Sequence, residues 1–352
     1  MKTRRRSYNS DENRERISDL PDCVLIHILS TLNTKQTVQT CILSARWKNL
    51  WKLIPVISLD SFYFKSVKGF NEFVSRILFL RDDKTSLYAL NFYYRHINNH
   101  LLKRVMKYAF SHNVKVLKIL MGSCYESFPL CYFSSHTLTS LNITVSEWRR
   151  TIFPNSLNFP VLTNLSIRSF VFRSSGDNGF VEPFSAFKCL NTLIIDSCEI
   201  HDGEKLFISS ATLVNLTIKM FPFSYKFELS TPNLCSFDFT GIPIQKLSES
   251  NNSLSSIKHV NIDVKIEYPE QNYPLILLNW LTELALMESL TVSSKTLQIL
   301  YLVPNLWNID FPCLRNLKSL KIKNYGPSPI SYGVDDFLLQ KAPSAKKSII
   351  DL

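Results

Sequence analysis

Between residues 87 and 322, apolar side chains recur ten times as a triplet at positions i, i+3 and i+5. Successive triplets begin 21 to 30 residues apart, and most consist of Leu followed by a β-branched residue or Phe. Alternate residues of a strand point to one face, so each triplet predicts a short strand with one apolar face, repeated along the chain. The triplets are Leu87-Leu90-Phe92, Val114-Leu117-Ile119, Leu138-Leu141-Ile143, Leu162-Leu165-Ile167, Leu190-Leu193-Ile195, Leu213-Leu216-Ile218, Leu234-Phe237-Phe239, Ile257-Val260-Ile262, Met287-Leu290-Val292 and Leu317-Leu320-Ile322.

The interval between triplets decides between two architectures. Short strands at regular intervals also occur in β-sandwiches and barrels, but those usually turn every 8 to 12 residues or thereabouts, roughly half the interval here. A longer interval leaves room for a strand and a returning loop or helix. The pattern resembles that of leucine-rich repeats over roughly residues 87 to 323, in which units bury their apolar faces by stacking. The resemblance implies an α/β chain in which an irregular solenoid carries a parallel sheet on its concave face.

The residues between the apolar positions predict a polar concave face. If positions i+3 and i+5 point into the core, then i+2, i+4 and i+6 point to the opposite side of the strand. Any solvated strand face is polar, but solenoids commonly bind partners through this one, and its cations could complement an acidic segment or a phosphate. The residues that we predict to bind a target are Lys118, Arg168, Lys219, Asn261 and Lys321.

Before the repeats lies a second pattern, with helical spacing, which predicts three short helices. The first has Ser18 and Asp19 as candidate caps and Pro21 in its first turn, where a missing amide proton costs nothing. The second begins at or near Thr34 and the third at Ser44. A unit this small buries little, so we expect it either to lean on a partner or to close one end of the larger domain. The three apolar stripes are Val24-Leu25-Ile28-Leu29-Leu32, Val38-Cys41-Ile42 and Trp47-Leu50-Trp51.

The same segment, residues 16 to 60, carries a recognisable motif. Leu20-Pro21-Asp22, Ile28-Leu29, Leu43-Ser44 and the run from Arg46 to Trp51 closely resemble the F-box of plant F-box proteins. The resemblance implies that this segment docks on the Skp adaptor and, through it, on a cullin-RING ubiquitin ligase. The adaptor-binding residues that it implies are Leu20, Pro21, Val24, Leu25, Ile28, Leu29, Trp47, Leu50 and Trp51.

These two resemblances divide the chain into five expected segments. They are a basic disordered tail (1–15), the F-box helical module (16–60), a linker or first irregular repeat (61–86), the leucine-rich repeats (87–325) and a truncated C-terminal segment (326–352). The last segment looks like the stretch that precedes an FBD-type module in many family members, here incomplete. Residues 345–348 stand where another leucine-bearing strand is expected, so we expect the last repeat to be poorly capped.

Composition and charge narrow the function. The chain has 352 residues, 45% of them hydrophobic, and a net charge of +11. Its cations are spread along the chain instead of forming a basic arm with interleaved aromatics, which disfavours nucleic-acid binding. The sequence shows no apolar signal core and no run of about eighteen apolar residues, so we expect no membrane association and an intracellular location, nucleus or cytoplasm. Eight cysteines without a Cys-x-x-Cys pair predict buried free thiols.

No sequence motif of a phosphate loop, a nucleotide-binding fold, a nucleophile elbow or a zinc protease is present. We therefore expect no catalytic residues, no metal and no cofactor. The leading hypothesis is the substrate-recognition subunit of an SCF-type ligase that binds an unknown target protein through its repeats. The alternative is a basic repeat protein that binds nucleic acid or a phosphorylated ligand without a ligase role, and a third possibility is a family member that has lost its target.

Overall fold

The structure is a computed structural model that describes residues 16–81, 85–94, 99–122, 134–146, 151–154, 157–173, 180–201, 205–220, 225–245, 247, 254–265, 272–325 and 333–351. The predicted tail at residues 1–15 lies outside the described residues. Every structural statement below concerns the described part of the chain.

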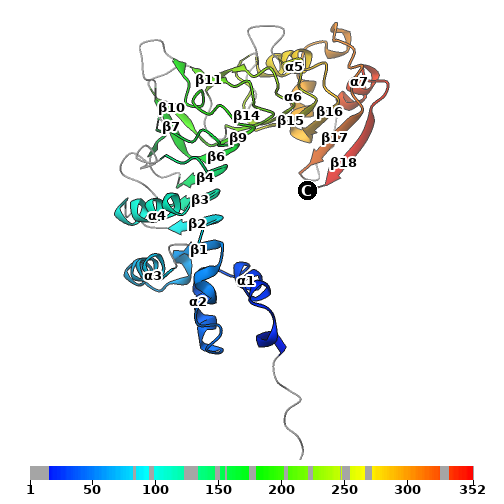
Figure 1. Cartoon of the computed structure of the whole chain (residues 1–352). Coiled ribbons are helices and arrows are strands. Elements are labelled where there is room, and N and C mark those ends of the chain that lie inside the picture. Colours follow the sequence, from blue (N-terminus) through cyan, green and yellow to red (C-terminus); the bar gives the residue numbers. More distant parts are fainter. Residues whose placement is uncertain are drawn as a thin grey trace, which may run out of the picture.

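A curved parallel sheet of twelve strands runs from β1 to β18 through the described residues (Figure 1). Neighbouring strands of the sheet follow one another along the chain, and each pair is parallel, so every connection must return outside the sheet. This arrangement confirms the predicted α/β fold with a parallel solenoid sheet. The strands are β1 (Val56–Asp60), β2 (Ala89–Tyr94), β3 (Val116–Met121), β4 (Ser140–Val145), β6 (Asn164–Arg168), β9 (Thr192–Asp196), β12 (Asn215–Lys219), β14 (Ser236–Gly241), β15 (His259–Val264), β16 (Ser289–Ser293), β17 (Ser319–Asn324) and β18 (Lys346–Asp351).

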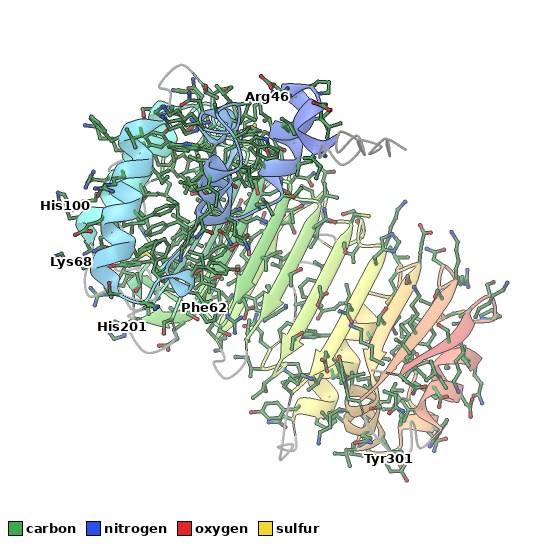
Figure 2. The ribbon with its side chains drawn as sticks, turned by 90° about the horizontal axis from the view of Figure 1, so that it is seen from below. Arg46, Phe62, Lys68, His100, His201 and Tyr301 are labelled. Atoms are coloured by element: carbon green, nitrogen blue, oxygen red, sulfur yellow. The ribbon has the colours of Figure 1, made fainter. Side chains whose placement is uncertain are left out.

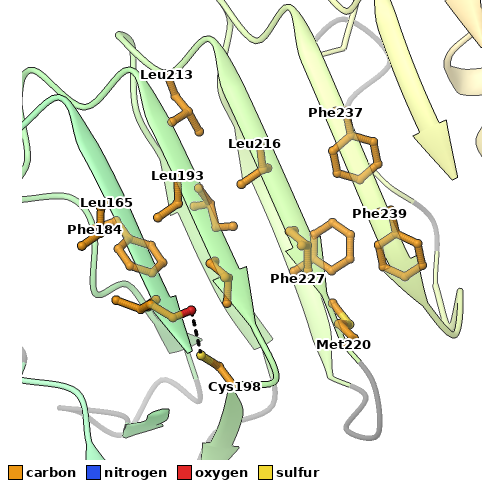
Figure 3. Close-up of a cluster of buried hydrophobic side chains, with 14 of the residues drawn as sticks. Leu165, Phe184, Leu193, Cys198, Leu213, Leu216, Met220, Phe227, Phe237 and Phe239 are labelled. Atoms are coloured by element: carbon orange, nitrogen blue, oxygen red, sulfur yellow. Dashed lines mark hydrogen bonds between the residues drawn. The ribbon is translucent and has the colours of Figure 1, made fainter. Parts of the chain in front are cut away.

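The apolar triplets form the core beneath this sheet. Every side chain of the ten predicted triplets is at most 3% exposed. Figure 3 shows how Leu193 and Leu216, on neighbouring strands, point into one layer, which Phe184 and Phe227 of the return segments complete. Burying a large apolar side chain stabilises a fold by about 1.5 to 3 kcal/mol. Because one repeat exposes its layer unless another covers it, that stabilisation is available only to the stack.

The return segments lie on the outer side of the curve and change in kind along it (Figure 1). Helices α3 (Val67–Leu80) and α4 (Asn99–Ser111) cover the first strands, and α5 (Tyr273–Glu283), α6 (Ser294–Tyr301) and α7 (Val334–Gln340) cover the last ones. Between them lie two small three-stranded parallel sheets. Their strands are β5 (Thr151–Ile152), β7 (Phe170–Arg173) and β10 (Glu199–His201), then β8 (Phe180–Val181), β11 (Lys205–Ser209) and β13 (Lys226–Ser230).

The sheet begins earlier than the ten triplets. Strand β1 pairs with β2, and Ile54, Ile57 and Leu59 repeat the i, i+3, i+5 spacing with at most 1% exposure each. This eleventh triplet lies inside the segment that the sequence assigns to the F-box module. The module and the solenoid therefore share a stretch of chain.

The sheet ends on a strand with a different pattern. Strand β18 occupies the stretch where the sequence predicts a leucine-bearing strand, but Lys347 pairs in register with Leu320, and every residue of β18 is exposed. Ile349, which pairs with Ile322, is 46% exposed. The last strand thus adds backbone pairing to the sheet while contributing little to the core.

The N-terminal module differs in detail from its prediction. Helix α1 (Asp22–Ser30) begins after Pro21, its N-cap, so the predicted caps Ser18 and Asp19 are wrong; they belong to the short 3-10 helix η1 (Arg16–Asp19). Helix α2 (Thr34–Gln39) is capped by Asn33, which forms a capping box with Gln36. In place of a third α-helix the chain makes successive i to i+3 turns from Ser44, ending in the 3-10 helix η3 (Leu50–Leu53). A further 3-10 helix, η2 (Thr40–Ile42), follows α2.

Candidate docking site and target-binding face

A small apolar cluster holds the N-terminal module together. Leu25 and Leu29, one turn apart on α1, are fully buried and pack with Trp47, Leu50 and Ile54, which are at most 4% exposed. Residues four apart lie on one side of a helix, so the two leucines face η3 across this cluster. The cluster fixes the orientation of α1.

Arg46 connects the start of α1 to the turns that precede η3. Its Nη2 and Nε donate to Oδ1 of Asp22 at 2.7 and 3.0 Å, and Nη2 also donates to the carbonyl of Leu20 at 2.5 Å. Both side chains are substantially exposed, so the pair contributes little to stability, on the order of 1 kcal/mol or less. Its role is to hold the Leu20–Asp22 corner in place (Figure 2 labels Arg46).

The module also exposes apolar side chains. Val24 and Ile28, also one turn apart on α1, are 38% and 39% exposed, while Ile42 and Leu43, directly after α2, are 88% and 61% exposed. Ile17 is 56% exposed. Exposed apolar groups concentrated in a small module are typical of a surface that a partner covers.

The structure therefore separates the predicted adaptor-binding residues into two groups. Pro21, Val24 and Ile28 are exposed and Leu20 is half-buried, so these can touch a partner directly. The other predicted residues lie in cores, where they position α1. The predicted adaptor-binding residues did not include the exposed Ile42 and Leu43, although Leu43 is part of the F-box motif. The buried set is Leu25, Leu29, Trp47, Leu50 and Trp51.

A continuous junction connects the module to the solenoid. Trp51 is 5% exposed within the core of the repeats, and the Thr34 hydroxyl accepts a hydrogen bond from the Ser58 amide of β1 at 2.8 Å. Arg81, only 2% exposed, donates to the carbonyls of Ile54 and Thr85, at 2.9 Å each. Because buried polar groups must be paired to be tolerated, these bonds fix the module against the first repeat.

The concave face has the alternation that the sequence predicts. In β4 and β6 the triplet residues are buried and the residues between them are exposed or half-buried. Cross-strand registers place Lys118, Asn261 and Lys321 in one row across the sheet and put Arg168 and Lys219 on either side of Asp196 in the next row. Eight strand steps separate Lys118 from Lys321, roughly 40 Å along the sheet. The five predicted residues thus lie on one face but do not form one site.

Two of these residues, Arg168 and Asn261, already have partners within the chain. Nε of Arg168 lies 3.9 Å from Oδ1 of Asp196. Nδ2 of Asn261 donates to Oδ2 of Asp238 at 2.8 Å, and Nζ of Lys323 donates to Oδ1 of Asn261 at 3.2 Å. The centre of the face, on β14 and β15, is therefore an internally bonded polar network.

A second network lies at the carboxyl end of β15. Asp263, 6% exposed, accepts a hydrogen bond from the Tyr325 hydroxyl at 3.3 Å and lies 2.9 Å from Nζ of Lys265. Burial and the charge of Asp263 raise the pKa of Tyr325 above its ordinary value. The tyrosine therefore stays protonated at neutral pH and acts as a donor to the carboxylate.

Within the described residues, no group of three or more His, Cys, Asp or Glu side chains could hold a metal ion. No helix of the described chain is long and apolar enough to cross a membrane.

Comparison with known proteins matches the module and the whole chain to the same group. Residues 17–58 match the family model of the F-box domain. An F-box/FBD/LRR-repeat protein of Arabidopsis thaliana is 41% identical over 28% of this chain and 18% of its own length. An F-box protein of the same plant is 23% identical over 94% of this chain and 90% of its own length. F-box/LRR-repeat protein 13 of Arabidopsis thaliana is 25% identical over 98% of this chain and 78% of its own length.

The N-terminal helices, the parallel solenoid and the family match together define an F-box protein. More particularly, the chain is a plant F-box protein of the leucine-rich-repeat type. F-box domains in general bind a Skp adaptor, and F-box proteins are generally non-catalytic.

Proposed function

We propose that this protein is the substrate-recognition subunit of an SCF-type cullin-RING ubiquitin ligase, inside the cell. The F-box docks on the Skp adaptor, and the repeats hold a target protein near the ubiquitin-charged enzyme. The ligase performs the chemistry, while this chain raises the effective concentration of a target lysine at the reactive thioester. It needs no catalytic residue, cofactor or metal of its own for this role.

The observation that carries the proposal is the pairing of an F-box match with exposed apolar side chains on that same segment. Val24, Ile28, Ile42 and Leu43 would be covered by the adaptor, together with Leu20 and Pro21 at the corner that Arg46 holds. The buried residues of the prediction, such as Leu25 and Trp47, would act by fixing α1.

The junction supports the second half of the proposal. A receptor can place its target at a fixed distance from the ligase only if its two ends are rigidly connected. Trp51, Thr34 and Arg81 supply that connection, because each joins the F-box segment to the core or the backbone of the first repeat. The target would meet the concave face, to which the residues Lys118, Arg168, Lys219, Asn261 and Lys321 all belong.

The test is a pull-down of purified Skp adaptor by the full chain. We expect the unmutated chain to bind and the double variant Ile28→Asp with Ile42→Asp to lose binding, because buried charge at an apolar interface is costly. The double variant Leu20→Ala with Pro21→Ala should weaken binding through the corner. A matched control is Phe79→Asp, which places the same charge at a side chain 85% exposed outside the F-box.

Thermal melts show whether each variant is folded, since both F-box targets are at least 39% exposed. Retained binding by the folded Ile28→Asp and Ile42→Asp variant would contradict the assigned surface. Absence of binding by the unmutated, folded chain would contradict the ligase role.

A further inference from the structure

The last two strands of the sheet carry three lysines on the concave face. Lys321 and Lys323 alternate with the buried Leu320 and Ile322 on β17, so they point to the concave side. Lys346 of β18 pairs in register with Ser319, which lies on that same side. The three ammonium groups therefore project from one patch, which we call the lysine row.

Two neighbouring lysines, Lys318 and Lys347, form ion pairs, whereas those of the lysine row do not. Nζ of Lys318 lies 2.7 Å from Oε2 of Glu288, and Lys347, on the opposite side of β18, pairs with Asp335 of α7. Among the described residues, no carboxylate forms an ion pair with Lys321, Lys323 or Lys346; the recorded partner of Lys323 is the neutral amide oxygen of Asn261.

The neighbouring strand offers no compensating charge. Thr291 and Ser293 of β16 occupy the concave positions next to Lys321 and Lys323. Asp263 on β15, two strands away, is held by Lys265 and Tyr325. Asp351 of β18 pairs in register with Asn324 and accepts a hydrogen bond from its side chain. Like charges on adjacent strand positions repel each other, so the row is stabilised when an anion binds to it.

The spacing of the lysines indicates the shape of that anion. Three register pairs of β17 and β18 follow one another on the concave side of the sheet: Ser319 with Lys346, Lys321 with Ser348, and Lys323 with Ile350. Two residues along a strand span about 6.6 Å, so Lys346, Lys321 and Lys323 mark three levels at that interval. An extended peptide repeats its side chains on one side at the same interval.

We infer that the lysine row of β17 and β18 binds an acidic segment of the target protein, extended along β17 with carboxylates at alternate residues. This inference rests on the proposed function and specifies the partner chemistry of its target-binding face. Carboxylates fit better than one phosphate. A phosphate is bound by converging donors such as Arg forks or free backbone amides, whereas here the cations are lysines one level apart and the strand amides of β17 are paired with its neighbours.

The experiment measures binding of fluorescent peptides to the full chain by polarisation at low salt. The probe has three Glu at alternate positions separated by Thr; comparison peptides replace Glu by Gln, place the three Glu consecutively, or carry a single phosphoserine. We expect the alternating peptide to bind best. The variant Lys321→Gln, Lys323→Gln, Lys346→Gln should weaken it about tenfold or more, since each exposed ion pair contributes modestly and three are lost.

The matched control removes three exposed lysines from the outer helices, as Lys68→Gln, Lys107→Gln and Lys295→Gln. It should leave the affinity within about twofold, because only long-range attraction changes and salt screens it. Equal loss in the control, equal binding of the Gln peptide, or no binding to the unmutated chain would overturn the inference. Tighter binding of the phosphoserine peptide would replace it with a phosphate site, and equal binding of the consecutive peptide would refute the alternating register. Adaptor pull-down with the same preparations separates these failures from a failure of the ligase role.

Discussion

The F-box and the solenoid of this protein differ both in the surface that they expose and in the size of the core beneath it. The F-box has a thin core of five fully or nearly fully buried side chains, Leu25, Leu29, Trp47, Leu50 and Ile54, and exposes Ile42 and Leu43. The solenoid has a continuous core under twelve strands of the described chain and exposes a polar concave face. Apolar contact suits a constant partner such as an adaptor, while placed charges suit the selection of one target among many.

The largest expected effect concerns the thick core. Trp280 of α5 is fully buried, its ring centroid lies 4.7 Å from that of Phe239, and it also contacts Phe227 and Phe237. Trp280→Ala should lower the free energy of unfolding by about 3 to 5 kcal/mol, because it removes a large side chain and leaves a cavity. Urea titration measures the change. Phe79→Ala, at a position 85% exposed, is the control and should change it by no more than about 0.5 kcal/mol.

The difference between the two cores also predicts whether the loss of stability in the solenoid extends to the F-box. If the F-box folds as a separate unit, Trp280→Ala at low temperature leaves adaptor binding intact. If adaptor binding and the repeats of this variant are instead lost in one transition, at the same temperature, the two cores form one cooperative unit.

The next effect tests the junction itself. The guanidinium of Arg81 is buried without a carboxylate partner among the described residues and donates to the carbonyls of Ile54, Thr85 and Ser86 and to the Tyr108 hydroxyl. Arg81→Ala leaves those acceptors unpaired, so we expect a loss of about 2 to 3 kcal/mol. Protease cleavage near residues 54–86 should also become faster. Arg76→Ala, at an exposed position of α3, the helix that Arg81 follows, is the control; an equal effect there would contradict a specific role of Arg81 at the junction.

Each sequence pattern predicts only those features of the structure that its own residues determine. The triplets depend only on alternation and a long interval, so the strands and the concave face could be read from them. Strand β18 has Lys347 where a leucine stands in β17, and its pairing with Asp335 depends on the tertiary fold. The motif identified the F-box segment, but it could not predict that Val24 is exposed while Leu25 is buried, because that difference depends on how α1 packs.

A smaller effect distinguishes the two surfaces by salt. Between roughly 0.05 and 0.3 M salt, charge interactions between exposed groups are progressively screened. Adaptor binding through Val24, Ile28 and Ile42 should change by less than about twofold, whereas binding of the alternating acidic peptide to the lysine row should fall severalfold. Parallel titrations of one preparation measure both. A steep salt dependence of adaptor binding would indicate that charges, not these apolar side chains, dominate the docking surface.

The smallest effect is the pH response of the thick core, where Cys198 and Tyr225 are both at least nine-tenths buried. Figure 3 shows the Cys198 thiol directed at the Ile167 carbonyl. Burial raises the pKa of the Cys198 thiol to about 12, and burial and the charge of Cys198 raise that of Tyr225 well above its ordinary value. In the unfolded chain these groups ionise near about pH 8.5 and 10. The unfolded chain therefore releases protons that the folded chain retains, so the contribution of these two groups to stability is constant below about pH 8 and falls as the pH rises from about 8.5 towards 12.

Urea midpoints at pH 7.5, 9 and 10 test this expectation, with the double variant Cys198→Ala and Tyr225→Phe as the matched comparison. The variant should lose part of the decline above pH 9, and an unchanged decline would show that other groups cause it. Thiol labelling separates the two ends of the molecule in the same samples. At pH 8, Cys23 of α1 is exposed and should react at once, whereas Cys198 should react only at the rate of unfolding, since a buried thiol with a pKa near 12 has almost no thiolate. Rapid labelling of Cys198 in the folded protein would mean that the core of the repeats opens locally, and the distinction between a thin and a thick core would then fail at the side chain expected to be among the best protected.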